Sequence, residues 1–127
     1  MIAVDTSALI AVVAGEELAR DCEQILVSSE LIMSAGTLTE ALIVSSRKDI
    51  RSELQRLMSV LDLRIENVTP DFARRAASVY DRWGKGAHPA SLNYGDCFSY
   101  AVAELHGCPL LFVGDDFSRT DIRSALG

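Results

Sequence analysis

The sequence predicts an α/β protein built on a parallel sheet, arranged as a single domain over residues 1–127. Apolar stretches typical of strands alternate with helical patterns almost to the end of the chain, which is the pattern of α/β folds. No internal repeat, low-complexity tract or long linker interrupts this alternation. The length and the 49% hydrophobic content are enough for one domain with a sizeable core.

The chain begins with a short predicted strand and two helices. Ile2–Val4 is an apolar run, and Thr6 and Ser7 lead from it into a helix that Gly15 breaks. Asp5 therefore lies between strand and helix, where it can cap the helix or take part in a site at the end of the strand. The second helix has an apolar stripe of Leu18, Cys22, Ile25 and Leu26.

A second strand and two more helices follow. Residues 31–34, LIMS, form the strand, and Gly36 and Thr37 start a helix that has Glu40 in about its first turn. This helix repeats Leu38, Ala41, Leu42 and Ser45 at a period near 3.6. The clearest amphipathic helix is the next one, because its apolar residues are spaced at i, i+4, i+7, i+8 and i+11: Ile50, Leu54, Leu57, Met58 and Leu61.

The third strand is expected over residues 63–68, and clear start signals predict the helix after it. Thr69 is a good N-cap and Pro70 a good first helical residue, so we expect a helix that runs to about Trp83. The segment 84–95, GKGAHPASLNYG, is polar and contains three of the eight glycines. This composition predicts a loop.

The last helix and the last strand complete the predicted sheet. The helix begins at Asp96 and ends at Gly107, where glycine suits a left-handed C-cap. Its inward-facing residues are Phe98, Ala101, Val102 and Leu105. Pro109 then starts the fourth strand, PLLFV, which ends at the sequence Gly114, Asp115 and Asp116.

Several features of the composition limit the class of protein. The N-terminus lacks a basic region and contains Asp5, so we expect no signal peptide, and no apolar run approaches the roughly 18 residues of a membrane span. Cys22, Cys97 and Cys108 are odd in number and widely spaced, which disfavours a disulfide framework or a zinc site. We therefore expect a cytoplasmic protein with reduced thiols.

The net charge of −6 is unevenly distributed along the chain. Between Arg47 and Lys85 there are nine basic and six acidic residues, a balance of +3, which leaves −9 for the rest. A basic middle is consistent with a phosphate-binding surface beside an acidic pocket, although solvated helix faces give the same counts. The best candidates for such a surface are Arg74, Arg75, Arg82 and Lys85.

Acidic residues are expected to meet at one edge of the sheet. Right-handed β-α-β connections make the strands parallel, so Asp5, Glu40, Asp96 and the pair Asp115 and Asp116 all fall near the carboxyl ends of strands. Each acid alone is explained as a helix cap, a first-turn charge or a turn residue. Together they would repel one another unless a cation neutralised them. With only oxygen donors, the cation should be Mg²⁺ or Mn²⁺, which can support phosphodiester hydrolysis.

Four motifs resemble those of the PIN-domain ribonucleases, specifically the VapC toxins of bacterial toxin–antitoxin pairs. They are VDTSAL around Asp5, LTEAL around Glu40, LNYGDCFSYAVA around Asp96 and LLFVGDDFSRTDI around Asp115 and Asp116, and their order and spacing match over essentially the whole chain. The resemblance implies a three-layer α/β/α fold with a central parallel sheet of about four to five strands. It also implies a metal-dependent endoribonuclease whose metal-binding catalytic acids include Asp5, Glu40 and Asp96.

The same resemblance implies an RNA substrate, a cognate antitoxin, and a homodimer or a toxin–antitoxin hetero-oligomer. For the fourth acid we choose Asp116 over Asp115, because Phe117 should turn inward and fix the residue directly before it. Adjacent acids can both help a metal through water, so Asp115 stays a possible participant. Neither the RNA nor the cleaved base follows from these residues.

Other classes of function account less well for the sequence. A signalling receiver also gathers acids and Mg²⁺, but it would need a lysine after a late strand, and the only lysines are Lys48 and Lys85. A non-catalytic module with an acidic docking surface would not require metal. A Ser-His-Asp hydrolase would need a histidine at a strand end, and His106 lies at a helix end instead. The aromatic residues Trp83, Tyr94 and Tyr100 either stack on bases or form core or dimer contacts.

Overall fold

Four parallel strands form the centre of the computed structural model, which describes residues 1–127. They are β1 (Ile2–Val4), β2 (Leu31–Ser34), β3 (Leu63–Glu66) and β4 (Leu110–Leu111). The order across the sheet is β3-β2-β1-β4, and Ala3 of β1 pairs with Ile32 on one side and with Leu110 on the other. The parallel sheet and its strand count therefore agree with the prediction.

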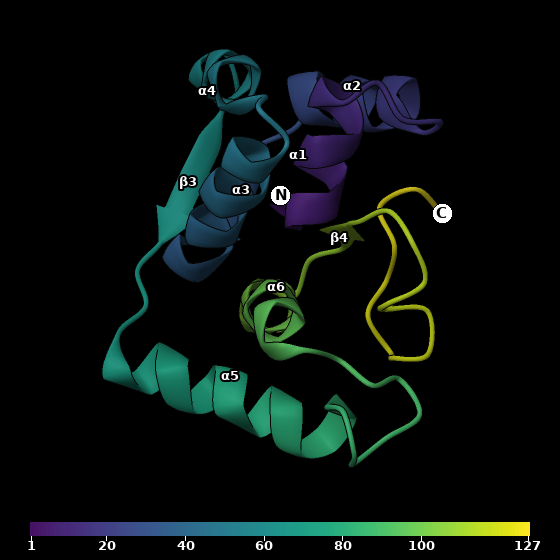
Figure 1. Ribbon diagram of the computed structural model, residues 1–127. Helices are drawn as coiled ribbons and strands as arrows, with labels where there is room; N and C mark the ends of the chain where they lie inside the picture. The colour runs from purple at the N-terminus through teal and green to yellow at the C-terminus, as the bar shows by residue number, and fades with distance from the viewer.

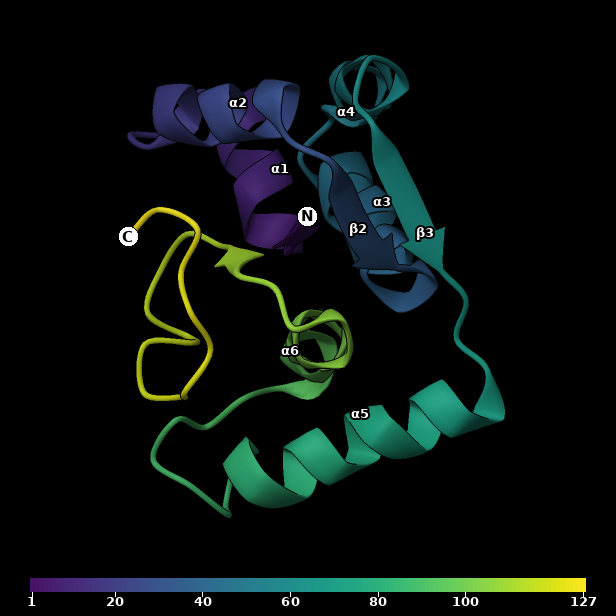
Figure 2. The same ribbon diagram turned by 180° about the vertical axis from the view of Figure 1, so that it is seen from behind.

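Six helices cover the sheet (Figure 1). They are α1 (Thr6–Val13), α2 (Ala19–Ser28), α3 (Ala35–Arg47), α4 (Arg51–Ser59), α5 (Pro70–Trp83) and α6 (Tyr94–His106). Figures 1 and 2 show α1 to α4 on one side of the molecule and α5 and α6 on the other, with α5 outside α6. The three-layer α/β/α arrangement is confirmed. No helix combines the length and the apolar character needed to cross a membrane.

Successive side chains of each strand point to opposite faces of the sheet, and this alternation creates two separate cores. Ala3, Ile32 and Leu110 point to the α5–α6 side, where they join a cluster with Phe98 and Tyr100. The strand residues that point to the other side pack with apolar residues of α1 to α4. These strand residues are Val4, Leu31, Met33 and Leu111. Both faces are buried, as expected for a parallel sheet. Because all four strands are parallel, their carboxyl ends meet at one edge.

Several element boundaries differ from the sequence prediction. α6 begins at Tyr94 rather than at Asp96, because Asn93 is the N-cap and Asp96 is the third helical residue of a capping box. β4 is only two residues long, because the chain leaves the sheet after Leu111. β3 ends at Glu66, two residues before the predicted end. The predicted helix from Pro70 to about Trp83 matches α5.

The end of the chain folds back onto the outer strand β4. The backbone N–H of Leu110 donates to Arg123, and Ala125 donates to the carbonyl of Leu110, so a short parallel bridge joins Leu110 to Ser124. Phe117 is 2% exposed and packs against Phe112 with ring centroids 5.1 Å apart. The segment after β4 is thus held without a helix or strand of its own.

Candidate active site

A pocket of about 280 Å³ lies at the carboxyl edge of the sheet and brings four predicted acids together. Asp5, Glu40, Asp96 and Asp116 all line it, although they come from β1, α3, α6 and the segment after β4. Asp115 does not line it. The convergence expected from right-handed β-α-β connections is therefore present in the fold.

Asp5 is held by three hydrogen bonds. It directly follows β1 and caps α1, accepting at Oδ2 from the backbone N–H of Ser7 (3.1 Å) and from the Ser7 hydroxyl (2.6 Å). The Ser99 hydroxyl donates to Oδ1 at 2.5 Å, from a position on α6 that is 94 residues away in sequence. Asp5 is 6% exposed, so these donors replace the water that its carboxylate would otherwise bind.

Behind Asp5, a chain of buried hydroxyl groups joins three elements. The Ser99 hydroxyl lies 3.3 Å from that of Thr37, which lies 3.3 Å from that of Ser34. Ser34 ends β2 and caps α3, accepting from the backbone N–H of Thr37. The orientation of Asp5 is thus tied to the starts of α1 and α3 and to the side of α6.

Glu40 lies on α3 where α3 packs against the first turn of α6. Its Oε1 accepts from the hydroxyl of Thr6 at 2.7 Å. Its other carboxylate oxygen lies against Gly95, where a Cβ atom would have no room. Burial raises the pKa of Glu40; the Thr6 hydrogen bond opposes this effect, and the charges of Asp5 and Asp116 add to it.

Asp96 is buried at the start of α6, and its capping role does not exclude a role in the site. Its Oδ2 accepts from the backbone N–H of Asn93 at 3.1 Å, and the Asn93 side chain accepts from the Asp96 backbone N–H at 2.9 Å. Burial raises the pKa of Asp96 to about 7; the Asn93 hydrogen bond opposes this rise, and the charges of Asp116, Asp5 and Glu40 add to it.

The two adjacent aspartates after β4 differ in position. Both are exposed, but only Asp116 lines the pocket. The Asp115 carbonyl instead accepts from the backbone N–H and the hydroxyl of Ser118, which closes a turn. Ser7 connects this loop to Asp5, because its hydroxyl accepts from the Val113 N–H at 3.0 Å. This geometry favours Asp116, the residue chosen from the sequence.

The acidic residues have the chemistry of a site for a hard cation, although their side chains are not yet close enough to coordinate one. No three Asp, Glu, His or Cys side chains are grouped closely enough to hold one ion. The pocket nevertheless offers carboxylate oxygens that accept no hydrogen bond, on Asp96 (Oδ1), Glu40 (Oε2) and Asp116. An all-oxygen donor set of this kind fits Mg²⁺ or Mn²⁺.

The predicted basic residues do not line this pocket. Arg75 and Arg82 both pair with Glu104, at 3.4 and 3.0 Å, and Arg74 pairs with Asp71 at 2.9 Å. Glu104 lies eight residues after Asp96 on α6, roughly 12 Å along the helix axis. Lys85, in the loop after α5, forms no ion pair. All four basic residues therefore lie on α5 or directly after it, outside the acidic pocket.

Neither histidine lines the pocket. His106 pairs through Nε2 with Glu66 at 2.8 Å, and His88 packs edge-on against Trp83. These contacts give both rings structural surroundings away from the acids, and a Ser-His-Asp arrangement is absent.

Four hydroxyl residues of the site were missed by the sequence analysis: Thr6, Ser7, Thr37 and Ser99. Thr6, Ser7 and Thr37 were noticed only as residues that start a helix. A signal for Ser99 exists, because it lies three residues after Asp96 and so shares a side of α6 with it. Thr37 has no local signal, since its role depends on a contact with α6.

Comparison with known proteins gives this geometry a context. The PIN domain family model matches residues 2–123. The chain is 46% identical to ribonuclease VapC42 of Mycobacterium tuberculosis over 96% of this chain and 97% of that protein. Two solved structures share the fold. One is VapC20 of Mycobacterium tuberculosis, a toxin that cleaves the sarcin–ricin loop; it matches with a TM-score of 0.75 and 21% identity over 96% of each chain. The other is a toxin–antitoxin complex from Klebsiella pneumoniae, which matches with a TM-score of 0.73 and 20% identity over 100% of this chain and 98% of that one. The chain therefore belongs to the PIN-domain family and, within it, to the VapC ribonucleases.

Proposed function

We propose that this protein is a divalent-metal-dependent endoribonuclease that acts as the toxin of a toxin–antitoxin pair, with Asp5, Glu40, Asp96 and Asp116 as its catalytic acids. The observation that carries the proposal is the meeting of these four carboxylates, from four separate segments, in one pocket of a chain that belongs to the VapC ribonucleases. A toxin–antitoxin complex among its structural neighbours supports the second half of the proposal.

Electrostatics explains why such a pocket needs a cation. Four carboxylates repel one another, and they also repel the phosphate of an RNA strand. Bound Mg²⁺ or Mn²⁺ would neutralise them, activate a water and stabilise the charge that develops on the phosphate. Asp96, Glu40 and Asp116 offer free oxygens for this purpose, while Asp5 is oriented by Ser7 and Ser99.

The finer assignments follow from the same proposal. The protein acts in the cytoplasm as one PIN domain over residues 1–127, as a homodimer or in a hetero-oligomer with its cognate antitoxin. RNA is the substrate, and the basic surface of Arg74, Arg75, Arg82 and Lys85 contacts its backbone. No observation favours a signalling receiver, because neither Lys48 nor Lys85 lines the acidic pocket.

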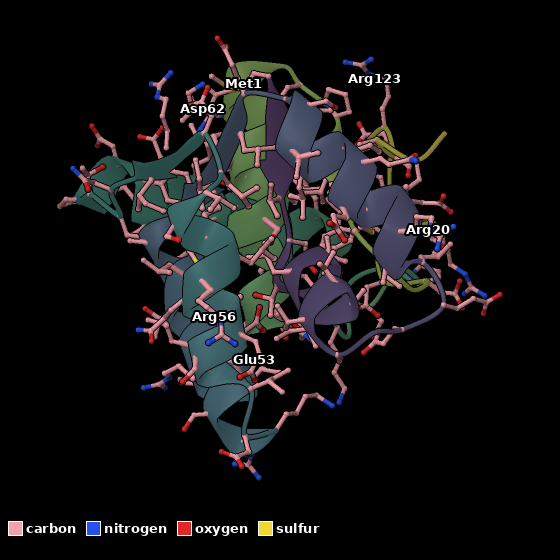
Figure 3. The ribbon with its side chains drawn as sticks, turned by 90° about the horizontal axis from the view of Figure 1, so that it is seen from above. Met1, Arg20, Glu53, Arg56, Asp62 and Arg123 are labelled. Atoms are coloured by element: carbon pink, nitrogen blue, oxygen red, sulfur yellow. The ribbon has the colours of Figure 1, made fainter.

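The test is incubation of the pure protein with total RNA in the presence of Mg²⁺, Mn²⁺ or a chelator. We expect cleavage that the chelator abolishes, and a loss of at least about a hundred-fold for Asp5→Asn, Asp96→Asn and Asp116→Asn, because each removes a charge from the site. Two matched variants should cleave normally: Asp115→Asn, next to the pocket, and Asp62→Asn. Figure 3 shows Asp62 beside Met1, at the opposite edge of the sheet, where the strands begin.

Metal-independent cleavage, or undiminished cleavage by Asp5→Asn and Asp96→Asn, would overturn the proposal. A larger loss for Asp115→Asn than for Asp116→Asn would reverse the choice of the fourth acid alone. Circular dichroism of each variant shows whether a loss of activity accompanies a loss of fold.

A further inference from the structure

Side-chain hydrogen-bond donors are scarce in the acidic pocket. No lysine, arginine or histidine lines it, and only three of its lining side chains can donate: Thr6, Ser7 and Asn93. The Thr6 hydroxyl donates to Glu40 at 2.7 Å, and the Ser7 hydroxyl donates to Asp5 at 2.6 Å. Asn93 is therefore the one lining residue whose side-chain donor is not already used by an acid of the site.

The N-cap of α6 determines which end of the Asn93 amide is free. Its Oδ1 accepts from the backbone N–H of Asp96 at 2.9 Å, as the oxygen of an N-cap residue does. The reversed amide would set its NH₂ group against that N–H, donor against donor, so only one orientation keeps the cap. The Nδ2 group donates to no group of the chain, and Asn93 is exposed. This NH₂ group is thus available to a ligand in the pocket.

Asn93 is also held firmly beside an acid of the site. Its backbone N–H donates to Oδ2 of Asp96 at 3.1 Å, and its carbonyl accepts from the Cys97 thiol at 3.3 Å. Together with the cap, these bonds tie both the backbone and the side chain of Asn93 to the first turn of α6. The free NH₂ group therefore has a fixed place, which is what a donor to a reacting group requires.

A phosphate in this pocket needs such a donor. Apart from Asn93 and the two occupied hydroxyls, every polar side chain of the lining is a carboxylate, and carboxylates repel a phosphate. A divalent cation offsets the acids, but negative charge on the phosphate still grows during cleavage. A neutral amide can stabilise that charge, whereas a lysine or arginine at this place would pair with the acids and compete with the cation.

We propose that Asn93 is a catalytic residue whose Nδ2 group donates a hydrogen bond to a non-bridging oxygen of the phosphate at the cleaved bond. The inference rests on the proposed ribonuclease function and adds a residue that contacts the substrate directly. The same side chain caps α6 through its oxygen and contacts RNA through its nitrogen. Because the charge on the phosphate grows during cleavage, this hydrogen bond is strongest in the transition state and acts on kcat more than on KM.

The first experiment separates the two ends of the amide with Asn93→Ser and Asn93→Asp, on a short synthetic strand that copies a site cut in total RNA. Both replacements keep an oxygen that can cap α6, and neither has an NH₂ group. We expect kcat to fall about ten-fold or more for both, while Tm stays within a few degrees of wild type. For Asn93→Ser, the affinity for Mn²⁺ in calorimetry should be unchanged, because no carboxylate is lost.

Thr69→Ser is the matched control for this experiment. Thr69 is the N-cap of α5, and its hydroxyl oxygen accepts from the backbone N–H of Phe72 at 3.1 Å, as Asn93 does from Asp96. Thr69 does not line the acidic pocket, so Thr69→Ser should cleave RNA normally. A comparison of the two N-cap substitutions therefore separates the cap from the contact with RNA.

The second experiment changes the phosphate instead of the protein. One non-bridging oxygen at the cleaved bond is replaced by sulfur, which is a weak hydrogen-bond acceptor. Each diastereomer is cleaved in Mn²⁺, because Mn²⁺ tolerates a sulfur ligand better than Mg²⁺ does. Wild type should cleave one diastereomer about ten-fold more slowly than the unmodified strand. Asn93→Ser should lack this selective loss, since its NH₂ group is already absent.

Three outcomes would overturn the inference and leave metal-dependent cleavage in place. One is an unchanged kcat for Asn93→Ser, and another is the same sulfur effect in wild type and in Asn93→Ser. In the third, removal of the 2′-hydroxyl at the cleaved nucleotide, rather than sulfur, abolishes the difference between the two proteins, which would assign the contact to the sugar. If wild type neither binds nor cleaves RNA with Mg²⁺ or Mn²⁺, the proposed function itself fails, and this inference fails with it.

Discussion

Asp5 and Asp96 are both buried aspartates at the carboxyl edge of the sheet, yet the fold stabilises their charges unequally. Asp5 receives three donors from Ser7 and Ser99, whereas Asp96 receives one backbone donor and faces three other carboxylates. The protein thus keeps a group at its site that is costly to ionise when no cation is present. A strained electrostatic state of this kind is common at functional sites, where ligand binding relieves it.

This difference predicts how stability depends on pH in the metal-free protein. Asp96 has a folded pKa of about 7, above its ordinary value, so the folded state binds this proton more tightly than the unfolded state. The contribution of Asp96 to the free energy of unfolding is therefore fully present at low pH and is lost as the pH rises through about 7. Asp96→Asn stays neutral, so it should be more stable than wild type above neutrality, on the order of 2 kcal/mol after solvent screening, with the gap closing toward acid.

Urea unfolding in chelator at about pH 5 and about pH 8 measures this gap. Asp62→Asn, which removes an exposed acid far from the pocket, should show no such pH dependence. A stability difference between Asp96→Asn and wild type that is the same at both pH values would contradict the prediction.

At the scale of elements, the close packing of α3 on α6 sets the position of Glu40. Gly36 and Gly95 are two of the closest points of this contact: a Cβ at Gly36 would lie 2.8 Å from the Phe98 ring, and one at Gly95 would meet the Glu40 carboxylate. The two glycines therefore have different roles in the same helix contact. Gly36 leaves room for the Phe98 ring in the apolar core, and Gly95 leaves room for the Glu40 carboxylate.

Substitution of these glycines should affect stability and activity differently. In Gly95→Ala the end of the Glu40 side chain can move aside, so stability should change by less than about 1 kcal/mol, while displacement of the carboxylate should lower kcat about ten-fold or more. In Gly36→Ala the buried Phe98 ring must shift, so stability should fall by about 1–3 kcal/mol. Thermal unfolding and single-turnover cleavage measure the two effects, and a fully active Gly95→Ala protein would show that Glu40 needs no fixed position.

The elements themselves were largely predictable, and their boundaries were less so. Thr69 and Pro70 fixed the start of α5 because capping is a local property. The start of α6 was placed two residues late, since Asp96 fits an N-cap as well as it fits the third residue of a capping box. Hydroxyl contacts such as Thr37 with Ser99 join residues 62 apart, and no local pattern contains that information.

For the molecule as a whole, the candidate acids and the candidate basic residues lie in different layers. Asp5, Glu40, Asp96 and Asp116 lie at the carboxyl edge of the sheet, while Arg74, Arg75 and Arg82 lie on α5 in the outer layer. The sequence analysis left a phosphate-binding surface and solvated helix faces as two explanations of the basic residues, and it did not predict that Glu104 would engage both Arg75 and Arg82. Because exposed ion pairs are weak, Arg75 and Arg82 can exchange Glu104 for an RNA phosphate. Arg74 and Lys85 are more exposed, so they are the more accessible residues for a phosphate to contact.

The salt dependence of RNA binding tests whether this surface meets the RNA backbone. The double variant Arg74→Ala and Lys85→Ala should bind RNA of any sequence more weakly, and the slope of log K against log salt should become shallower by about 2. The double variant Arg20→Ala and Arg56→Ala, which removes two exposed arginines from the opposite side of the sheet, is the matched control. Equal binding by the test variant at every salt concentration would show that these side chains only solvate α5.

The return of the chain end onto β4 limits how this protein can polymerise. Parallel sheets with two open edges can extend without limit, as in fibrils, when backbone groups on each edge stay unpaired. Here Arg123 and Ala125 satisfy the backbone of Leu110, so only β3 has an open edge, and it carries exposed Arg64. Two molecules could join their sheets only through β3, and the joined sheet would then have no free edge for a third. Loss of the last few residues would leave the backbone of β4 unpaired, and this second open edge could then pair with another molecule.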